Sequence, residues 1–382
     1  MAQTVSIIGA GFAGLAAVRA LAPVACRAEV TVRLFDTRPY TTMVPALADC
    51  AGGRYEDGYL TEDISRLLPA GVGFHQEHVD AVDLEDQTLT TARTTYAWDY
   101  LVLAAGAVTD FHGFDQHLED VHKLDSLDDA RSMRQAFATY ADGAEQPHAV
   151  VVGGGYTGMQ LACNLRYAGR ECTPRPKITV VELKDHILPF MPAWVRDYMR
   201  RRAGQHGIEL RPGLSVAEFD GRDVQLSDGT RLKHVFLAWA AGTTRPITRL
   251  RGNHEQLDDG RLVVDDCLRV PEHEAAFVAG DCAAIRSHGS YLRKAVNFSL
   301  GSGRCAGGNI ANALRGRRPS TFRPVDLGWV IPFCDVGVGE VLSKYRVRGR
   351  VPLSLYCAMC GLRNYNWTNR LYFWRKALRA LH

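Results

Sequence analysis

The 382-residue sequence has no apolar run near the roughly 20 residues that a helix needs to cross a bilayer. Its first apolar stretch begins at Val5, so we expect no secretory signal peptide. We therefore expect a cytoplasmic protein that meets a membrane only at its surface. The 46% of hydrophobic residues and 23% of charged residues are typical of a globular core, and the length predicts two domains.

Metal-binding spacings are also missing. The thirteen histidines form no H-x-x-x-H or H-E-x-x-H pair, and Cys357-x-x-Cys360 lacks the second pair that a zinc site requires. We predict no metal site. The ten cysteines are scattered through mostly apolar contexts, which favours reduced thiols over a disulfide framework. Cys163 and Cys282 are expected to be packing residues.

Acidic residues are absent after Glu340, whereas nine Lys and Arg follow it in a chain whose net charge is only +3. The last of them accompany apolar residues at alternating spacings of four and three, which predicts a basic amphipathic helix. Such a helix is typical of a membrane-surface anchor, and packing against the protein itself or a second copy is the alternative. Binding of nucleic acid is not expected. The apolar positions are Trp367, Leu371, Trp374, Leu378 and Leu381.

The first glycine-rich motif, G-x-G-x-x-G, follows an apolar strand and precedes a helix of small residues. Gly9 permits the tight turn, Gly11 lets a pyrophosphate approach the backbone, and Gly14 lets helix and strand pack closely. The next apolar strand ends in Asp36, which is placed to accept hydrogen bonds from a ribose 2′-hydroxyl. The N–H groups at the start of the helix complete a site for a dinucleotide.

The same motif returns as Gly153-x-Gly155-x-x-Gly158, with Glu182 at the end of the following strand. Each half also contains a strand that ends in a small-residue turn, YLVLAAG and VFLAWAAG. We therefore predict an α/β fold with two Rossmann-like domains, the second inserted into the first. The predicted boundaries are 1–118 with 263–325 for the first domain, 119–262 for the second, and 326–382 for a C-terminal interface segment.

Between the motifs we expect several further elements. A polar helical stretch should reach about Leu68, residues 124–141 should form a helix, and residues 78–90 and 213–232 should form antiparallel excursions. The predicted helix over 294–315 contains four glycines. Each interior glycine costs about 1 kcal/mol relative to alanine, so we predict that this helix packs very closely on another backbone or cofactor, a broken helix being the alternative.

The two fingerprints, the two A-x-G turns and Gly280-Asp281 resemble the two-dinucleotide-binding flavoprotein superfamily. Within it the chain is similar to the type II NADH dehydrogenases, which are single-subunit NADH:quinone oxidoreductases. The likeness covers nearly the whole chain and is strongest in VELKDHILPFMP, LAWAAG and AAFVAGDCA. The resemblance implies FAD on the first fingerprint, NADH on the second, a quinone as acceptor, and a peripheral place on the inner face of the membrane.

The resemblance also implies the site. Gln160 would lie near the nicotinamide and Lys294 near the flavin, where the N-terminus of the following helix would stabilise negative charge. Glu182 would favour NADH over NADPH, and Lys184 would soften that preference. The cofactor-binding residues implied are Gly9, Gly11, Phe12, Ala13, Gly14, Asp36, Thr37, Arg38, Val79, Ala105, Gly106, Gly153, Gly155, Thr157, Gly158, Glu182, Gly242 and Asp281.

The sequence departs from this family in ways that leave the electron acceptor open. Gln160 stands where the family usually has Glu, and a neutral amide orients a ligand but takes no proton at neutral pH. Residues 293–299 lack the proline and paired glutamines that the family carries at the quinone end. One alternative is a sulfide:quinone reductase-like enzyme that uses Cys357 or Cys360. The other is a flavoprotein sensor similar to apoptosis-inducing factor. A homodimer is left open.

Overall fold

The chain divides into two units in the computed structural model, which describes residues 3–27, 29–247 and 249–381. The first unit comprises Met1–Thr41, Glu62–Val108 and Thr243–Leu327, and the second comprises Thr42–Thr61, Thr109–Gly242 and Gly328–His382. The loop after the first βαβ start and the C-terminal segment thus group with the second fingerprint. The boundaries that we expect for the two cofactor domains stay a prediction.

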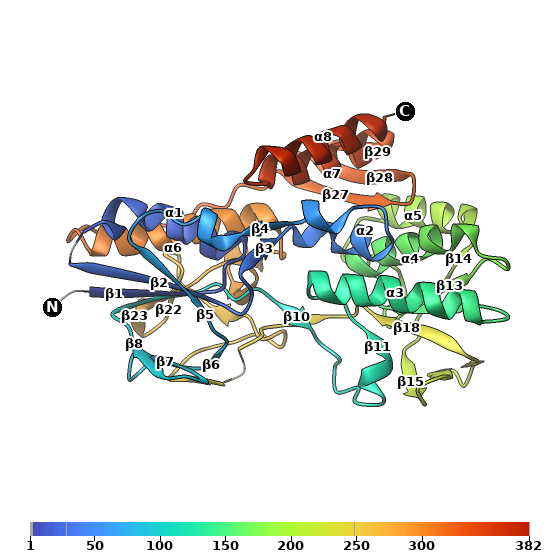
Figure 1. The fold of residues 1–382 in the computed structure, drawn as a ribbon, viewed down its shortest axis with the longest axis horizontal. Helices are drawn as coiled ribbons and strands as arrows, with labels where there is room; N and C mark the ends of the chain where they lie inside the picture. Colours follow the sequence, from blue (N-terminus) through green and yellow to red (C-terminus); the bar gives the residue numbers. More distant parts are fainter. Residues whose placement is uncertain (1–2, 28, 248, 382) are drawn as a thin grey trace. The chain divides into compact units, whose positions relative to one another are not determined.

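The first unit is built on a six-stranded sheet whose central strand, β1, precedes the first fingerprint (Figure 1). The side chains of Val5, Ile7 and Ile8 on β1 are buried, as expected for a strand covered on both faces. All neighbours pair in parallel except β22 with β23. In spatial order the strands are β22 (Arg269–Val270), β23 (His273–Val278), β9 (Tyr100–Leu103), β1 (Gln3–Ile8), β2 (Val30–Asp36) and β5 (Val72–Gln76).

Helices α1 (Phe12–Ala25) and α6 (Val296–Ala313) run side by side over one face of this sheet (Figure 1). A Cβ at Gly303 would lie 2.7 Å from the carbonyl carbon of Ala13, and one at Gly307 would lie 2.8 Å from Cα of Ala17. The two backbones are therefore in contact, and α6 is unbroken. The prediction of close packing is confirmed, and the alternative of a broken helix is wrong.

The second unit repeats this plan with a five-stranded, wholly parallel sheet. The order β18-β12-β13-β14 matches β9-β1-β2-β5, so the two halves that share the glycine-rich motif also share their strand order. The strands are β11 (Val121–His122), β18 (Val235–Trp239), β12 (His148–Val152), β13 (Lys177–Glu182) and β14 (Ile208–Pro212), and the helices are α3 (Leu127–Gly143), α4 (Tyr156–Ala168) and α5 (Ala193–Gln205).

Both antiparallel excursions are present. The first unit carries the sheet β20-β6-β7-β8, and the second carries β15-β16-β17. Their bounds are β20 (Arg249–Arg251), β6 (Val79–Asp83), β7 (Thr88–Thr91), β8 (Thr95–Ala97), β15 (Val216–Phe219), β16 (Val224–Leu226) and β17 (Arg231–Leu232). The remaining short strands are β3 (Tyr40–Thr42), β4 (Thr61–Asp63), β10 (Val108–Thr109), β19 (Thr243–Thr244), β21 (Leu262–Val263), β24 (Ala283–Ala284), β25 (Arg286–Ser287) and β26 (Ser290–Tyr291).

The polar helical stretch expected up to Leu68 is wrong. In this part of the chain, all of which the structure describes, the one α-helix is the five-residue α2 (Leu47–Ala51), which is buried and is followed by short turns and β4. Pro45 and the glycine pair after Ala51 stop the helix at both ends.

The C-terminal segment forms a three-stranded antiparallel sheet followed by two helices (Figure 1). Its elements are β27 (Gly328–Phe333), β28 (Val336–Val341), β29 (Tyr345–Gly349), α7 (Arg350–Arg363) and α8 (Trp367–Arg379). Among the described residues no helix combines the length and apolarity that crossing a membrane requires.

A disulfide joins Cys163 on α4 to Cys334 in the turn between β27 and β28. The expectation of reduced thiols throughout is therefore wrong at these two positions, and Cys163 is a covalent link rather than a simple packing residue. The eight other cysteines are free thiols.

Candidate functional site

The first fingerprint forms an open cradle at the end of β1. Gly9 has φ +101°, and its N–H donates to the carbonyl of Phe35 over 2.8 Å, so the turn is tight. A Cβ at Gly11 would meet nothing within 4 Å, so the space in front of this residue is open. No side chain caps the N-terminus of α1, which leaves the first N–H groups of the helix available to an anion.

Asp36 is fixed against this cradle by two backbone N–H groups. Oδ2 accepts from Ala10 over 2.7 Å, and Oδ1 accepts from Arg38 over 3.0 Å. A carboxylate held in this way keeps lone pairs free for the hydroxyls of a ribose. The same βαβ segment also contains the predicted residues Phe12, Ala13, Gly14 and Thr37.

The other residues predicted for the first cofactor also lie in the first unit. Gly106 has φ +76° with open space at its Cβ position, and its carbonyl accepts from Cys282 Sγ over 3.1 Å. Ala105 is half-buried, and Val79 is a buried residue at the start of β6. Asp281 lies in a short 3-10 turn, where burial raises the pKa of its carboxyl and nearby Lys294 lowers it.

Lys294 precedes α6, whose N-terminus also has no side-chain cap. Its Nζ donates to Thr243 Oγ1 over 2.7 Å and to the Thr243 carbonyl over 3.2 Å, and it lies 3.6 Å from a carboxylate oxygen of Asp259. The Oδ1 of Asp281 accepts from Ser299 Oγ over 3.2 Å. The start of α6 therefore brings a cation and a carboxyl group to one place.

Arg245 is a residue that the sequence reasoning missed. Its side chain is buried, and burial lowers the pKa of its guanidinium. Nε donates to the Gly260 carbonyl and Nη2 to Gln256, whereas Nη1 is buried without a hydrogen-bond partner in the structure. An unpaired buried guanidinium nitrogen is costly, which indicates that a ligand oxygen completes it. The only sequence signal was its place after the second small-residue turn.

The second fingerprint repeats the geometry of the first. Gly153 has φ +101°, and the N–H groups of Gly154 and Lys184 donate to the two carboxylate oxygens of Glu182 over 2.7 and 2.9 Å. A Cβ at Gly155 would again meet nothing within 4 Å, and α4 has no side-chain cap. Gly158 contacts the backbone of Gly153, Thr157 is exposed in the first turn of α4, and Gly242 has φ +77°.

Gln160 lies one turn further along α4 and is buried. Its amide nitrogen donates to Asp49 on α2 and to the hydroxyl of Tyr356 on α7. No local pattern in the sequence points to these partners, because they lie 111 and 196 residues away.

Cys357 and Cys360 are both buried thiols on α7. Burial raises the pKa of Cys357 to about 11 and raises that of Cys360 as well, and the Cys357 Sγ lies 3.1 Å from the hydroxyl of Tyr55. Because the thiolate is the reactive form of cysteine, such groups are poor nucleophiles.

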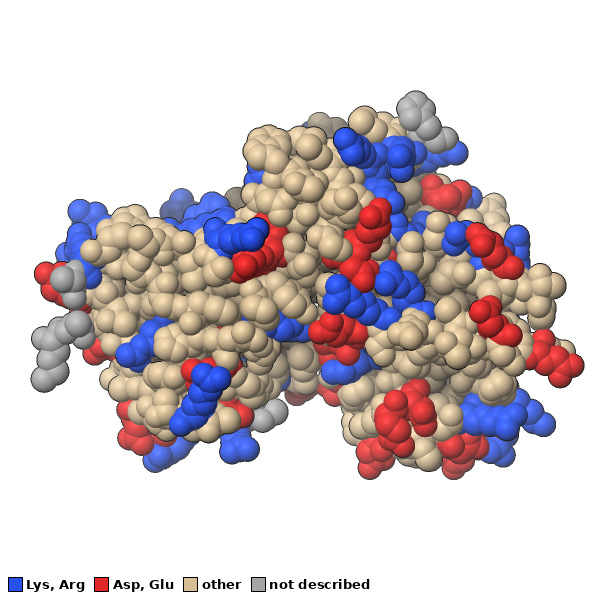
Figure 2. All heavy atoms as spheres, viewed as in Figure 1, with Lys and Arg blue, Asp and Glu red and all other residues tan. Residues whose placement is uncertain are grey.

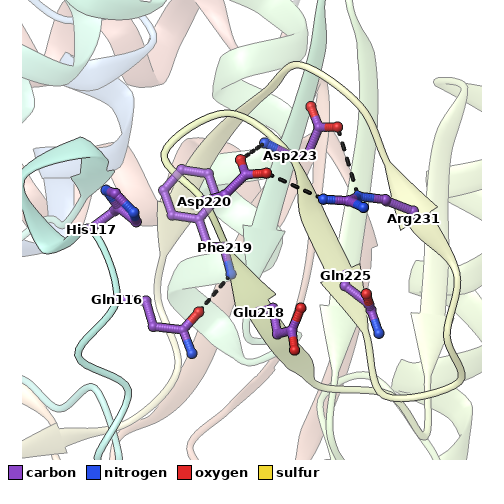
Figure 3. A pocket seen from close by; sticks show the side chains of 8 residues that line it. All are labelled: Gln116, His117, Glu218, Phe219, Asp220, Asp223, Gln225 and Arg231. Carbon is purple, nitrogen blue, oxygen red and sulfur yellow. Dashed lines mark hydrogen bonds and ion pairs between the residues drawn. The ribbon is translucent and has the colours of Figure 1, made fainter.

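A hollow of 390 Å³ lies in the second unit, lined by Phe219 and by polar or charged residues (Figure 3). Arg231 there pairs with Asp220 and Asp223, and no fingerprint residue lines it. Beside it His117, Glu119 and Asp120 place potential ligand atoms within 4.8 Å of one another, but all three are exposed, and exposed acidic groups are common without a metal ion.

Helix α8 has two apolar faces. Phe373 and Ala377 are buried against the rest of the second unit, while most of the predicted stripe faces outward, with Trp367 and Leu378 each 65% exposed. The exception in the stripe is Trp374, which is half-buried against Gly361 of α7. Figure 2 shows basic side chains gathered towards the C-terminal end of this segment, beside an uncharged lobe. The outer surface of α8 is therefore apolar and cationic together.

Comparison with known proteins places these features in context. The family model described as pyridine nucleotide-disulphide oxidoreductase matches residues 3–302. The chain is 31% identical over 360 residues to an NADH dehydrogenase-like protein of Mycobacterium tuberculosis, covering 89% of this chain and 87% of that protein. It is 27% identical over 375 residues to a type II NADH:quinone oxidoreductase of Staphylococcus aureus, covering 90% of each.

Two solved structures share the fold. One is NDH2 from Plasmodium falciparum in complex with NADH, with a TM-score of 0.84, 15% identity, and coverage of 100% of this chain and 98% of that one. The other is the sulfide:quinone oxidoreductase from Aquifex aeolicus, with a TM-score of 0.80, 16% identity, and coverage of 97% and 92%.

Proposed function

Because the chain belongs to the pyridine nucleotide-disulphide oxidoreductase family, we propose that it is an FAD-dependent enzyme that passes electrons from NADH to a quinone. The observation that carries the proposal is the repeated cradle, in which each fingerprint holds its own acid, Asp36 or Glu182, through backbone N–H groups. Two such cradles fit two dinucleotides.

The residues of the first unit fit FAD. The open space at Gly11 and the uncapped start of α1 suit a pyrophosphate, and Asp36 suits the adenosine ribose. The unpaired Nη1 of Arg245 requires an oxygen that the protein does not provide. The N-terminus of α6 and Lys294 supply positive potential where negative charge would develop. When bound, FAD takes two electrons from the nicotinamide and passes them to the acceptor.

The residues of the second unit fit NADH in the same way. Glu182 accepts hydrogen bonds from a ribose 2′-hydroxyl and repels a 2′-phosphate, which favours NADH over NADPH. The role of the chain in this reaction is to bind and orient, because hydride transfer between two bound cofactors needs no nucleophilic side chain.

The quinone and a membrane-surface location form the second part of the proposal. The outward apolar stripe of α8, with Trp367 and Leu378 among its most exposed residues, is flanked by arginines and carries no acid. A helix of this kind lies in the interface of an anionic bilayer, where quinones dissolve. We place the enzyme on the inner, cytoplasmic face. Whether two copies associate there is left to measurement.

Purified protein tests the first part. We expect a yellow protein with one FAD per chain that NADH bleaches without air, and turnover with a quinone but not with sulfide as donor. Asp36→Ala should lose flavin, while Glu182→Ala should keep flavin and raise the KM for NADH. A colourless protein that binds no added FAD would refute the proposal.

Vesicle flotation tests the membrane contact. We expect binding to anionic vesicles that salt weakens and that Leu378→Glu abolishes. Phe190→Glu is a matched control, because it adds the same charge at a residue that is 94% exposed in the same unit but lies outside α8. Equal binding of the two variants, or a preference for DNA over vesicles, would exclude a membrane role for the helix.

The sulfide-oxidising alternative has one structural argument in its favour, the shared fold with a sulfide:quinone oxidoreductase. Against it, Cys357 and Cys360 are buried and their pKa values are raised. We expect the double Cys→Ser variant at these positions to oxidise NADH at the normal rate.

A further inference from the structure

Three helices of the second unit meet around the carboxyl group of Asp49. Asp49 lies on α2, Gln160 and Asn164 on α4, and Tyr356 on α7, and the exposed fraction of each is between 2 and 6%. A carboxyl group at such a site is either ionised and matched by a cation or protonated and neutral.

No described cation contacts Asp49. The guanidinium of Arg54 acts on the pKa of Asp49, but its Nη1 donates to the carbonyl of Cys334 and its central carbon lies 4.5 Å from the ring centroid of Tyr167. Burial raises the pKa of Asp49, while Arg54 and hydrogen bonds from three side chains lower it. Lys376 on α8 donates to the carbonyl of Arg54. The other titratable groups that face Asp49 are Tyr55, Tyr156, Tyr356, Cys357 and Cys360.

The number of protons around these oxygens decides the state of Asp49. The hydroxyl of Tyr356 lies 2.7 Å from the carbonyl oxygen of Pro45 and 2.8 Å from Oδ2 of Asp49. A phenol has one proton to donate, a carbonyl only accepts, and an ionised carboxylate only accepts. With Asp49 ionised, one of the two short oxygen–oxygen contacts therefore lacks a proton. With Asp49 protonated, Tyr356 donates to Pro45 and Asp49 donates to Tyr356, so both contacts are hydrogen bonds.

The same groups fix the orientation of Gln160. Its Nε2 lies 2.8 Å from Oδ2 of Asp49, 3.1 Å from the Tyr356 hydroxyl and 3.5 Å from the Pro45 carbonyl. A flipped amide would set its oxygen against that carbonyl, which cannot donate. The amide nitrogen is thus committed to the cluster, and none of the described residues donates a hydrogen bond to the amide oxygen. Gln160 lies two residues beyond Gly158 of the second fingerprint.

We propose that Asp49 is held as a neutral carboxylic acid and is a positioning residue, which locks Gln160 so that its amide oxygen accepts from the carboxamide N–H of the nicotinamide. The second half of this statement rests on the proposed function, and the first half does not. When Asp49 ionises at high pH, Tyr356 turns its proton to the carboxylate and Pro45 loses its donor. The carbonyl of Pro45, which lies 3.5 Å from the amide nitrogen of Gln160, then draws an amide proton towards itself. This displaces the amide of Gln160, and NADH binds less tightly.

Infrared spectroscopy of the flavin-loaded or flavin-free protein tests the protonation state without any assay of activity. At neutral pH the wild type should show the carbonyl stretch of a protonated carboxylic acid, which shifts in D2O and is missing in Asp49→Asn. Asp281 is half-buried and its pKa is also raised, so the band is read from the difference between wild type and variant. Asp63→Asn is the control, because Asp63 is an exposed acid whose pKa is lowered by its hydrogen bonds from Ser65. An unchanged spectrum in Asp49→Asn overturns the proposal.

Steady-state kinetics test the positioning role. The KM for NADH of the wild type should rise with pH, approaching the limit of about tenfold per pH unit for one proton, while kcat stays level. In Asp49→Asn the KM should be independent of pH over the same range, and Asp63→Asn should follow the wild type. The same pH profile in wild type and Asp49→Asn refutes the positioning role. If no variant oxidises NADH, the proposed function has failed, and the infrared result still decides the state of Asp49.

Discussion

The backbone contact between α1 and α6 predicts that an added side-chain atom destabilises the protein, and a matched pair of substitutions isolates this cost. Gly303 and Gly308 lie on the same helix, so the same change to alanine gains about 1 kcal/mol of helix propensity at each. A Cβ at Gly308 meets nothing within 4 Å, whereas one at Gly303 would lie 2.7 Å from the carbonyl carbon of Ala13 and nearer still to its oxygen. Ordinary contact begins at about 3.4 Å, so α1 and α6 must separate by close to an ångström. Overpacking of this kind costs about 1–3 kcal/mol, and two rigid backbones place it at the upper end.

Urea unfolding of the holoenzyme, monitored by the fluorescence of the released flavin, measures the difference in the free energy of unfolding between the two variants. Because the propensity gain is common to both variants, Gly303→Ala should unfold about 3 kcal/mol more easily than Gly308→Ala, and Gly308→Ala should equal or exceed the wild type. The separation of the helices also displaces the start of α1, so Gly303→Ala should release flavin at lower urea. Two variants of equal stability would mean that α1 and α6 are not in backbone contact.

Four further outcomes follow from the structure. Cys163→Ser should lower the free energy of unfolding by about 2–5 kcal/mol, and a reductant should destabilise the wild type but not this variant. Partial burial raises the pKa of Asp57, but hydrogen bonds from two arginines outweigh this effect and lower the pKa from 3.8 to about 2. The wild type should therefore lose stability as the pH falls from about 4 towards 2, and Asp57→Asn should lose less stability in an acid titration. The pKa of Asp49 is raised, so its effect on stability has the opposite pH dependence: the wild type loses stability as the pH increases above 3.8. The melting temperature of Asp49→Asn should therefore rise relative to that of the wild type over this range. Glu182→Ser should narrow the preference for NADH over NADPH by about tenfold in kcat/KM, or about 1.4 kcal/mol.

The sequence predicted those features that local chemistry determines. Gly9 and Gly153 require positive φ, and each fingerprint is followed by an acid at a strand end, so the two cradles could be located without coordinates. The glycines of α6 also predicted its close packing, since their cost in helix propensity demands a compensating contact.

Features made by residues far apart in the chain could not be predicted in this way. The disulfide joins cysteines 171 residues apart, and the cluster around Asp49 draws on α2, α4 and α7. The prediction of a helical stretch up to Leu68 was wrong for a related reason. Its polar composition fits a helix, but the buried α2 serves contacts that only the folded unit defines.

The C-terminal segment and the helix of the second fingerprint share the buried cluster around Asp49, and this has a practical consequence for handling the protein. Removing residues after Gly349 to obtain a shorter chain free of lipid would also remove Tyr356, which covers Asp49, and Lys376, which ties the segment to Arg54. Water would then reach the carboxyl group, and the truncated chain would differ from the full chain at the cluster that holds Gln160 as well as in the lipid binding that we propose for α8. Detergent or amphipol, which leave the chain whole, are the safer means of keeping this enzyme in solution.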